Sequence, residues 1–587
     1  MFRHRRPKSP VYTTNGQNIG RSDHLRRPLL QFTRFGSASI LIASIFLVRV
    51  FILPIQTNVT LDEQYVLAVD LGTSGCKTAL VSCDGKVLAW KYSEISTQLL
   101  AGGGAEQVPN DWWQAFLQTA RSVLADSAVN PANVVAICCS TQGEGTIPVD
   151  REGTALMNCI TWMDMRGAGN LRKQVRGLIN VAGYDVFKLI RWLLLCGGAP
   201  SLSGKDPAAH MLFIRDMYPE IYQRTYKFLN VLDFFNLRLT GRYVSTYDSI
   251  LTSWVTDNRD ANHIRYHSGL IRDSGIDADK FPELVPCTEV IGTLLPEVAG
   301  AIGLSPSTRV IAGAIDNTAA AIGAGTLSDG EAHLYIGTSS WIGAHVAKKK
   351  TNIFTQIASL PCAVPSKYLM VAMQTSAGNN LSFLKEKVLY NQDALLQKEK
   401  LPDVYKIFDR IAENVPAGSD GLIYTPWLFG ERCPVDDRTL RAGLFNLSLD
   451  HTRETIIRAF FEGVALNTRW MLEPVQNFLG GEVKQLTILG GGASSKVWCQ
   501  IFADVLGIPI RQLAEPMQAN AIGVAMIAFV GLGQIDFETA AKQIRYGEVL
   551  LPDVVSHAVY DDAYSTFIEL HRRLSPLYKR LNKRGKQ

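Results

Sequence analysis

Two strand–glycine turn–strand segments restrict the fold of this chain more than any other feature of its sequence. In the first, apolar residues at 65–70 lead through the turn 71–75 into a second run at 77–82, and a third strand is predicted at 86–90. In the second, the run 333–336 leads through a glycine-containing turn into apolar residues that end at Ala344. Each segment lies early in its own half of the chain. We infer an internal duplication from this recurrence.

A single acid, Asp316, stands shortly before the second segment. The apolar run 310–312 predicts a buried strand that ends in Gly313, and Asn317 opens a helix of small residues. Asp316 is therefore expected at the tip of a strand, where a carboxylate can serve as a base. The alternative is that Asp316 only caps the following helix, and the local sequence leaves both interpretations open.

Length and charge indicate a multidomain enzyme without a nucleic-acid partner. The chain has 587 residues, of which 47% are apolar and 19% charged, as in globular proteins with more than one core. Residues 1–60 hold nine Lys or Arg against one acid, whereas the remainder holds 50 against 53 and lacks a basic surface of the kind that binds nucleic acid. The ten cysteines are scattered without metal-ligand spacing, which favours a reducing compartment.

Residues 1–62 form a basic and then apolar extension that we expect to lie outside the fold. An Arg-rich segment at 1–35 precedes a bilayer-length apolar run at 36–55, which Arg49 interrupts. Three interpretations remain open: a signal anchor, an organelle presequence, or residues upstream of the true start. The globular pattern begins near Gln64.

A second acid stands between two glycines at the end of another predicted strand. The run 134–138 is followed by a polar turn that contains Glu144, whose small neighbours leave room beside the carboxylate. We therefore expect Glu144 to face a ligand. The motif Trp162-x-Asp164-x-Arg166 follows, and its alternation predicts an acid and a base on one strand face. The alternative for that motif is a salt bridge at a strand end.

Three consecutive glycines connect a strand to a helix late in the chain. The run 486–489 leads through the glycine-rich residues 490–493 into a helix that continues to Asp504. Bare backbone amides at a helix N-terminus can hold a nucleotide closely. A tight turn without a ligand is the alternative, so this segment indicates a nucleotide site only in combination with other motifs.

Seven motifs occur in the order found in one known family. They are, in chain order, Asp70-Leu71-Gly72-Thr73-Ser74, Trp162-x-Asp164-x-Arg166, Leu239-Thr240-Gly241, Gly313-Ala314-Ile315-Asp316-Asn317, Gly430-Glu431-Arg432-x-Pro434, Glu462-Gly463 and Gly490-Gly491-Gly492-Ala493. Over about residues 64–575 the chain resembles the FGGY family of carbohydrate kinases, and it is most similar to the xylulokinase branch. The resemblance implies an α/β fold of two related actin/ribonuclease-H-like domains, as in sugar kinases and heat-shock-chaperone ATPases, with ATP and sugar in an interdomain cleft.

The resemblance also implies the domain limits and the reaction. Residues 63–325 would form the FGGY N-terminal domain, on the sugar and phosphate side, and residues 326–580 the C-terminal domain, on the nucleotide side. The implied reaction is phosphoryl transfer from ATP to a sugar or polyol hydroxyl, with D-xylulose to D-xylulose 5-phosphate as the leading candidate. The alternatives are a kinase for another ketose or polyol, such as ribulose or a glycerol-like compound, a non-catalytic member that binds sugar or nucleotide, and a chaperone-like ATPase.

Residue roles follow from the resemblance position by position. Asp316 matches the base that takes the proton from the sugar hydroxyl, and Asp70 matches the acid associated with Mg²⁺. The residues that match the ATP side are Gly72, Thr73, Ser74, Lys77, Gly337, Thr338, Ser339, Gly490, Gly491, Gly492, Ala493 and Asn520. The residues that match the sugar side are Gln142, Glu144, Trp162, Asp164, Asp316 and Asn317.

The sugar side departs from the xylulokinase pattern. Xylulokinases place Met-His where this chain has Gly143 and Glu144, and glycerol kinases place Arg-Glu there, so Glu144 matches a polyol-binding acid. A lysine that is usual in the family is replaced near His210, and a turn near Asp248 is altered. We therefore expect the phosphoryl transfer to be retained and leave the exact sugar open.

A kinase needs ATP, and this requirement bears on residues 1–62. The eight Lys or Arg before Gly36 would keep the basic flank in the cytosol and export the catalytic body, away from ATP. Arg49 would also oppose insertion by roughly 2.5–3.5 kcal/mol near the bilayer centre. We therefore expect a cytoplasmic enzyme without stable membrane insertion that is fully active when it starts near Leu61. Its expected partners are ATP and a small-molecule sugar, and a homodimer is left open.

Overall fold

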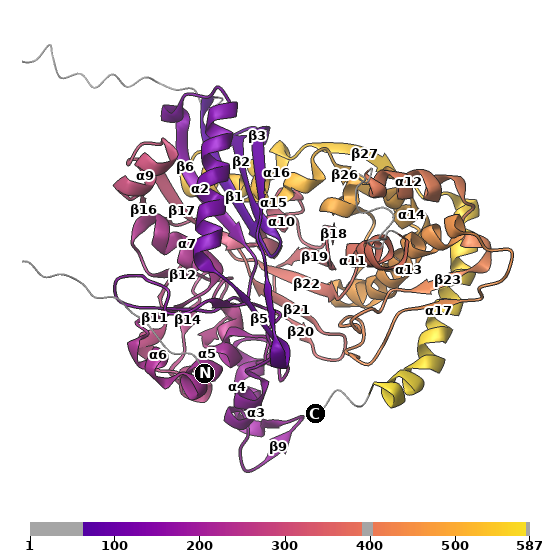
Figure 1. Ribbon diagram of the computed structural model, residues 1–587, viewed down its shortest axis with the longest axis horizontal. Helices are drawn as coiled ribbons and strands as arrows, with labels where there is room; N and C mark the ends of the chain where they lie inside the picture. The colour runs from indigo at the N-terminus through magenta and orange to yellow at the C-terminus, as the bar shows by residue number, and fades with distance from the viewer. Residues whose placement is uncertain (1–62, 390–402, 583–587) are drawn as a thin grey trace, which may run out of the picture. The chain divides into compact units, whose positions relative to one another are not determined.

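The computed structural model describes residues 63–389 and 403–582. The extension 1–62, with its apolar run, lies outside these residues, so the expectations about it stay predictions. None of the helices in the described ranges is both long and apolar enough to cross a membrane. The described residues contain two large β-sheets, each built from strands of one half of the chain (Figure 1).

The first sheet has six strands in the order β16-β17-β6-β1-β2-β3. Their bounds, in that order, are Val290–Thr293, Arg309–Ile315, Val134–Thr141, Tyr65–Gly72, Gly75–Ser82 and Val87–Glu94. β1, β6 and β17 run parallel, whereas β2 pairs antiparallel with both β1 and β3. The first predicted hairpin is thus confirmed. Since parallel strands end at one edge of a sheet, the residues that follow β1, β6 and β17 come together there.

The second sheet repeats this arrangement. Its order is β20-β21-β22-β19-β18-β25-β26-β27. The bounds, in that order, are Thr351–Asn352, Ile357–Pro361, Tyr368–Gln374, Ser340–Val346, Ala332–Ile336, Leu486–Leu489, Ile510–Leu513 and Tyr546–Leu550. The strands β22-β19-β18-β25-β26 match β3-β2-β1-β6-β17 in order and direction, which confirms the inferred duplication.

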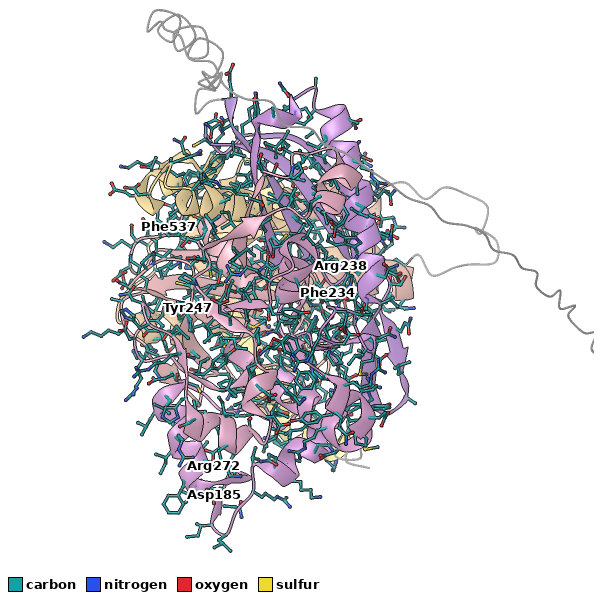
Figure 2. The ribbon with its side chains drawn as sticks, turned by 90° about the vertical axis from the view of Figure 1, so that its left-hand side faces the viewer. Asp185, Phe234, Arg238, Tyr247, Arg272 and Phe537 are labelled. Atoms are coloured by element: carbon teal, nitrogen blue, oxygen red, sulfur yellow. The ribbon has the colours of Figure 1, made fainter. Side chains whose placement is uncertain are left out.

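Helices cover both faces of the first sheet because alternate residues of β1 point to opposite sides. The main helices around the two sheets are, in chain order, α2 (Pro109–Asp126), α7 (Val231–Thr240), α9 (Pro296–Ile302), α10 (Asp316–Gly323), α11 (Gly378–Phe383), α12 (Val404–Asn414), α13 (Arg453–Leu479), α14 (Lys496–Leu506), α15 (Ala519–Gly531), α16 (Phe537–Gln543) and α17 (Val554–Leu581). Leu67 and Val69 pack with aromatic residues of α2 and α7, where Phe234 lies beside α2 (Figure 2). Val66 and Ala68 pack with α10 and α15.

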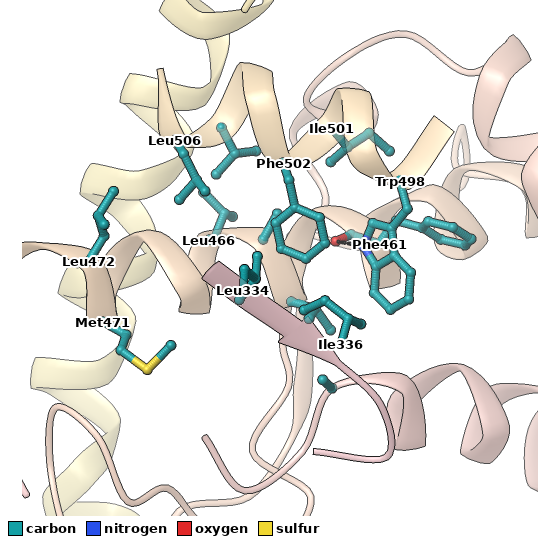
Figure 3. Close-up of a cluster of buried hydrophobic side chains, with 14 of the residues drawn as sticks. Leu334, Ile336, Phe461, Leu466, Met471, Leu472, Trp498, Ile501, Phe502 and Leu506 are labelled. Carbon is teal, nitrogen blue, oxygen red and sulfur yellow. Dashed lines mark hydrogen bonds between the residues drawn. The ribbon is translucent and has the colours of Figure 1, made fainter. Parts of the chain in front are cut away.

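The second sheet carries its own large apolar core on the face turned away from α10 and α15. Leu334 and Ile336 of β18 pack there with Phe461 of α13 and with Trp498 and Phe502 of α14 (Figure 3). The intervening strand residues belong instead to the cluster that includes α10 and α15. Successive side chains of β18 therefore point alternately into two different apolar cores, as those of β1 do.

Two helices from opposite halves of the chain, α10 and α15, are in close contact between the sheets (Figure 1). A Cβ on Gly323 would lie 1.9 Å from the carbonyl oxygen of Ala519, and one on Gly523 would lie 2.0 Å from that of Ala319. The helices can approach this closely only because both positions lack side chains. α15 also packs against β1, β2, β6 and β17, so the second half of the chain contributes a helix to the first sheet.

A smaller region between β6 and β16 has a separate apolar cluster. Its helices are α3 (Ala168–Gln174), α4 (Val186–Leu195), α5 (Pro207–Met217), α6 (Pro219–Arg224) and α8 (Ser268–Ser274). The strand predicted at 162–166 is wrong, because β8 covers only Cys159–Ile160 and the motif residues follow it as turns. The cause is Asp164, whose carboxylate accepts the Arg166 backbone amide at 2.8 Å and so favours a turn over a strand.

We predict that Gly523→Ala lowers the thermal stability of the protein, because its methyl group would force α15 away from α10. An alanine in a helix gains about 1 kcal/mol over glycine, so a net loss requires the steric effect to exceed that gain. Gly300→Ala on α9 is the matched control, since no atom lies within 4 Å of its added Cβ. Differential scanning calorimetry of both variants checks this. A melting temperature of Gly523→Ala at or above that of Gly300→Ala would contradict the close contact.

Candidate active site

Asp316 lies where the sequence predicts it, at the junction of β17 and α10. The register of β17 against β6 shifts between Ile311 and Ala314, and Gly313 within this bulge has φ +78°. A Cβ at that position would lie 2.2 Å from the carbonyl oxygen of Cys139, so only glycine fits. The bulge shifts the end of β17 by one residue, and this sets the direction in which Asp316 leaves the sheet.

A buried acid, Asp248, holds the end of β17 in place. Its Oδ2 accepts the Ile315 backbone N–H at 3.0 Å, and its Oδ1 accepts the Thr246 hydroxyl at 2.6 Å. Asp248 is 2% exposed, and burial raises the pKa of its carboxyl. Asp248 therefore fixes the peptide that directly precedes Asp316.

The carboxyl of Asp316 is poised to titrate near neutral pH. Burial raises its pKa, and the negative charges of Asp70 and Asp248 raise it further, while the Asn317 backbone N–H lowers it by a hydrogen bond of 2.8 Å. The net result is a pKa of about 7. A carboxylate with such a pKa can accept and release a proton under physiological conditions.

Asp70 lies near the end of β1, at the same edge of the sheet. Its Oδ2 is 3.5 Å from the Lys77 ammonium, and its Oδ1 accepts the Asn520 amide at 3.3 Å. Lys77 also donates to the Met517 carbonyl at 2.5 Å. The first and second halves of the chain therefore meet at Asp70.

The residues around Asp70 fit a hard cation that is shared with substrate phosphates. The Oδ1 atom of Asn520 is buried without a hydrogen-bond partner among the described residues. Throughout residues 63–389 and 403–582, no group of three His, Cys, Asp or Glu side chains could hold a metal ion alone. Mg²⁺ does not need such a cage, because it keeps waters and binds through one or two carboxylates plus substrate phosphates.

The turn between β1 and β2 is connected to the predicted sugar side by hydrogen bonds. The Thr73 hydroxyl donates to Gln142 Oε1 at 2.9 Å and accepts from Trp162 Nε1 at 3.0 Å. Gln107 completes the network, because it donates to the Thr73 carbonyl at 2.7 Å and accepts from Gln142 at 2.7 Å. The family resemblance puts Thr73 on the ATP side and Trp162 on the sugar side, whereas the structure brings the two side chains into direct contact.

The predicted nucleotide residues of the second hairpin turn and of the glycine loop lie together at the end of β18. Thr338 is exposed in the turn between β18 and β19, and its carbonyl accepts the Ala377 amide at 3.0 Å. Gly490 and Gly492 press against the last residue of β18, since Cβ atoms there would lie 2.6 Å from Ile336 O and 2.3 Å from Ile336 Cγ2. A short 3₁₀ helix, Gly491–Ser494, separates this loop from α14, so the glycines do not open α14 directly as predicted.

Glu144 lies in the turn after β6 with φ 62°, a left-handed conformation that is uncommon for a glutamate. Burial and the negative charge of Asp206 raise the pKa of Glu144 to about 7, while Arg432 and Lys205 oppose that rise. Asp316 contributes a smaller increase, which indicates that the two acids are near each other. Glu144 is thus a half-buried acid whose ionisation depends on several charged residues around it.

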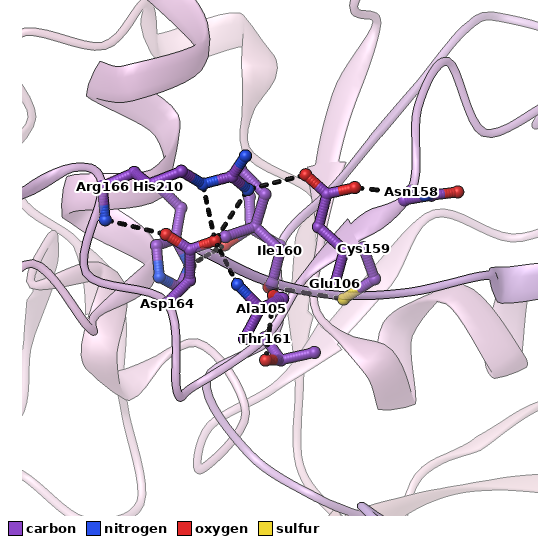
Figure 4. Close-up of polar contacts among 10 residues, drawn as sticks. Ala105, Glu106, Asn158, Cys159, Ile160, Thr161, Asp164, Arg166 and His210 are labelled. Atoms are coloured by element: carbon purple, nitrogen blue, oxygen red, sulfur yellow. Dashed lines mark hydrogen bonds and ion pairs between the residues drawn. The ribbon is translucent and has the colours of Figure 1, made fainter. Parts of the chain in front are cut away.

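Asp164 does not line the site as expected. Its fully buried carboxylate accepts the Ala105 amide at 2.9 Å and the Arg166 Nε–H at 2.9 Å, and Arg166 also contacts Glu106 at 2.6 Å (Figure 4). With its oxygens occupied in this way, the carboxylate fixes the turn that carries Trp162. The alternative weighed from the sequence, a salt bridge, therefore describes Asp164 and Arg166 better than ligand binding does.

Four charged residues near the site were missed or left without a role by sequence reasoning: Lys205, Asp206, Asp248 and Arg432. Arg432 belongs to a recognised motif, and Asp248 was noted only as part of an altered turn. Lys205 and Asp206 precede α5 in a loop without a characteristic pattern. No local signal in the sequence pairs them with Glu144.

Comparison with known proteins assigns the chain to a family. The N-terminal domain of the FGGY family of carbohydrate kinases matches residues 65–323, and its C-terminal domain matches residues 332–532. This chain belongs to the FGGY family of carbohydrate kinases. It is therefore a carbohydrate kinase that uses ATP, with the two-domain α/β fold of that family.

Relatives of this FGGY kinase differ in their substrates. A xylulose kinase from Bacillus subtilis is 29% identical over 88% of this chain and 98% of its own, and a gluconokinase from the same organism is 26% identical over 88% and 97%. The structure of a ligand-bound xylulose kinase from Lactobacillus acidophilus has a TM-score of 0.75 at 21% identity, covering 88% of this chain and all of that one. A Plasmodium falciparum glycerol kinase with ADP has a TM-score of 0.71 at 18% identity, with coverage of 86% and 98%.

We predict that Asp248→Ala slows turnover while Asp248→Asn largely retains it. Alanine leaves the Ile315 amide and the Thr246 hydroxyl without their acceptor, at a cost of about 1–3 kcal/mol per buried group, and releases the backbone before Asp316. The asparagine keeps an acceptor oxygen. Steady-state kinetics should show kcat reduced by about tenfold or more in the alanine variant, with the KM for ATP nearly unchanged. Asp562→Ala, an exposed acid on α17, is the control, and equal kcat values for Asp248→Ala and the control would contradict this role.

Proposed function

We propose that this FGGY kinase phosphorylates a ketose or polyol, with D-xylulose to D-xylulose 5-phosphate as the leading reaction and Asp316 as the general base. The observation that carries the proposal is the setting of Asp316. It lies where the parallel strands of the first sheet end, its backbone is fixed by Asp248, and its pKa is raised to about 7. Such a carboxylate suits proton abstraction from an alcohol.

The proposed reaction needs one proton transfer and one phosphoryl transfer. The Asp316 carboxylate takes the proton of the sugar hydroxyl as that oxygen bonds to the γ-phosphorus of ATP, and the bond to the β-phosphate oxygen breaks to release ADP. Asn317 lies next to this base and is a candidate for orienting the sugar. Protonation of Asp316 below its pKa stops the proton transfer, so kcat/KM, which reports the ionisation of the free enzyme, should fall as pH drops through about 7.

The nucleotide is proposed to lie along the two hairpin turns and the glycine loop. Gly72, Thr73, Ser74 and Lys77 of the first turn would face the phosphates together with Gly337, Thr338 and Ser339 of the second, and residues 490–493 with Asn520 would lie on the adenosine side. Asp70 would hold Mg²⁺, which when bound neutralises charge on the phosphate oxygens. The positions of Lys77 and Asn520, both in contact with Asp70, support this arrangement.

The sugar is proposed to contact Glu144, Gln142 and Trp162. Glu144 can accept hydrogen bonds from sugar hydroxyls through its charged carboxylate. The identity to a xylulose kinase supports D-xylulose, while the similar identity to a gluconokinase keeps sugar acids among the candidates.

We further propose that residues 63–325 and 326–580 form the two domains and that the enzyme acts in the cytoplasm. Coupled ADP-release rates over ketoses, aldoses, polyols and aldonates test the substrate directly.

We predict that Asp316→Asn abolishes turnover but leaves sugar affinity within a few-fold, because the amide keeps the shape of the side chain and cannot accept the proton. A general base contributes about 10²–10⁴-fold to a rate, so kcat should fall by that amount. Single-turnover measurements with a matched sugar-binding titration check both parts. A variant that retained more than about a tenth of the wild-type kcat would exclude Asp316 as the base.

Glu144→Ala is expected to raise the KM for the best sugar by about tenfold or more, because a charge-assisted hydrogen bond contributes about 1.5–3 kcal/mol. The KM for ATP should change little. Glu152→Ala removes an exposed acid in a nearby turn and serves as the control. Equal effects of Glu144→Ala on both substrates would argue against a sugar-side location.

Replacing Gly143 and Glu144 by Met-His should move preference toward D-xylulose if another sugar is the better substrate.

A further inference from the structure

The loop between α4 and α5 is held rigidly against the turn that carries Trp162. The Asp206 carboxylate accepts the Ser201 amide at 2.7 Å and the Trp254 indole N–H at 2.7 Å. Gly204 has φ +84°, and a Cβ there would lie 2.3 Å from the Ala168 amide nitrogen. The backbone on both sides of Lys205 is therefore fixed by the protein, independently of any ligand.

The side chain of Lys205 extends from this loop toward the predicted sugar side. Its ammonium lies 5.7 Å from the centroid of the Trp162 ring, and Trp162 in turn donates to Thr73. Burial and the positive charges of Arg438 and Arg432 lower the pKa of Lys205, while the negative charge of Glu144 opposes that shift. Lys205 is thus a half-buried cation at a site that already holds positive charge.

Lys205 differs from the other lysines of comparable burial. In the parts of the chain that the structure describes, each other buried or half-buried lysine has an oxygen partner within hydrogen-bond or ion-pair distance; these are Lys77, Lys91, Lys188, Lys227, Lys280, Lys349, Lys367 and Lys385. No described residue provides such an oxygen to the Lys205 ammonium. The ammonium is half-buried and has no acceptor from the described residues, so an oxygen atom of a ligand can take that place and form a charge-assisted hydrogen bond.

We propose that the Lys205 ammonium binds an oxygen atom of the sugar acceptor beside Glu144 and makes Lys205 a specificity-determining residue. This inference rests on the proposed function. The ligand chemistry is an electron-rich oxygen, which a carboxylate of an aldonate or a keto or hydroxyl oxygen of a ketose could supply. Lys205 donates a hydrogen bond to that oxygen, and Glu144 accepts one from a neighbouring hydroxyl. The pair therefore selects a sugar that has a hydrogen-bond acceptor next to a hydrogen-bond donor.

The test compares Lys205→Met and Lys205→Arg with the wild-type enzyme. Lys205→Met removes the charge and keeps an unbranched apolar side chain. Its KM for the best sugar should rise by about tenfold or more, with the KM for ATP within about twofold. Lys205→Arg keeps a cation and should recover part of the loss. Lys86→Met, an exposed lysine in the turn between β2 and β3, controls for the loss of one charge. An unchanged sugar KM in Lys205→Met, or equal changes for sugar and ATP, overturns the proposal.

The substrate panel distinguishes the two sources of the ligand oxygen. A larger loss for D-gluconate than for D-xylulose and D-ribulose identifies a carboxylate, and the reverse order identifies a keto or hydroxyl oxygen. If the wild-type enzyme turns over none of these compounds, the proposed function fails. The role of Lys205 is then tested by itself, by calorimetric titration that compares the affinity of wild-type and Lys205→Met for the same compounds. Tighter binding to wild-type than to Lys205→Met supports it, and equal or absent binding overturns it. Melting temperatures confirm that the variants are folded, and Lys205→Gln replaces Lys205→Met if that variant does not fold.

Discussion

The contact between α10 and α15 determines the relative positions of the catalytic groups. α10 begins with Asp316, and Asn520 near the start of α15 bonds to Asp70 across a sequence separation of 450 residues. Gly323 and Gly523 bring the backbones of α10 and α15 together, and α15 also packs on β1, so α15 connects the helix that begins with the base to the strand that carries Asp70. A larger residue at either glycine would move one carboxylate relative to the other.

The site concentrates negative charge where phosphate and a cation are expected. Asp70, Asp248 and Asp316 lie near one another, and their mutual repulsion together with burial raises the pKa of Asp316. Like charges disfavour ionisation of each group until an opposite charge arrives. A divalent cation bound at Asp70 would relieve part of this repulsion, so substrate binding and the ionisation of the base are expected to be coupled.

The two sides of the site differ in how far they follow the family. The hairpin turns, the glycine loop and the acid after β17 carry the recognised motifs, and the duplicated strand order of the two sheets places them. The sugar side depends on a turn and a loop that carry Glu144 and Lys205, which lie outside the recognised motifs, and on Arg432, which belongs to one of them. Overall identity is nearly the same to a xylulose kinase and to a gluconokinase, so individual side chains must decide the substrate.

The sequence by itself determined the two hairpins, the strand that ends before Asp316 and the glycine loop at the end of β25, because neighbouring residues set hydrophobic period and turn geometry. It could not choose between ligand binding and a salt bridge for Asp164, since the choice depends on Ala105 in another strand. Tertiary structure alone brought Asp248 to the Ile315 amide, 67 residues away, and put a helix of the second half onto the first sheet. Contacts between such distant residues depend on how complete elements pack, and no local pattern of residues encodes that packing.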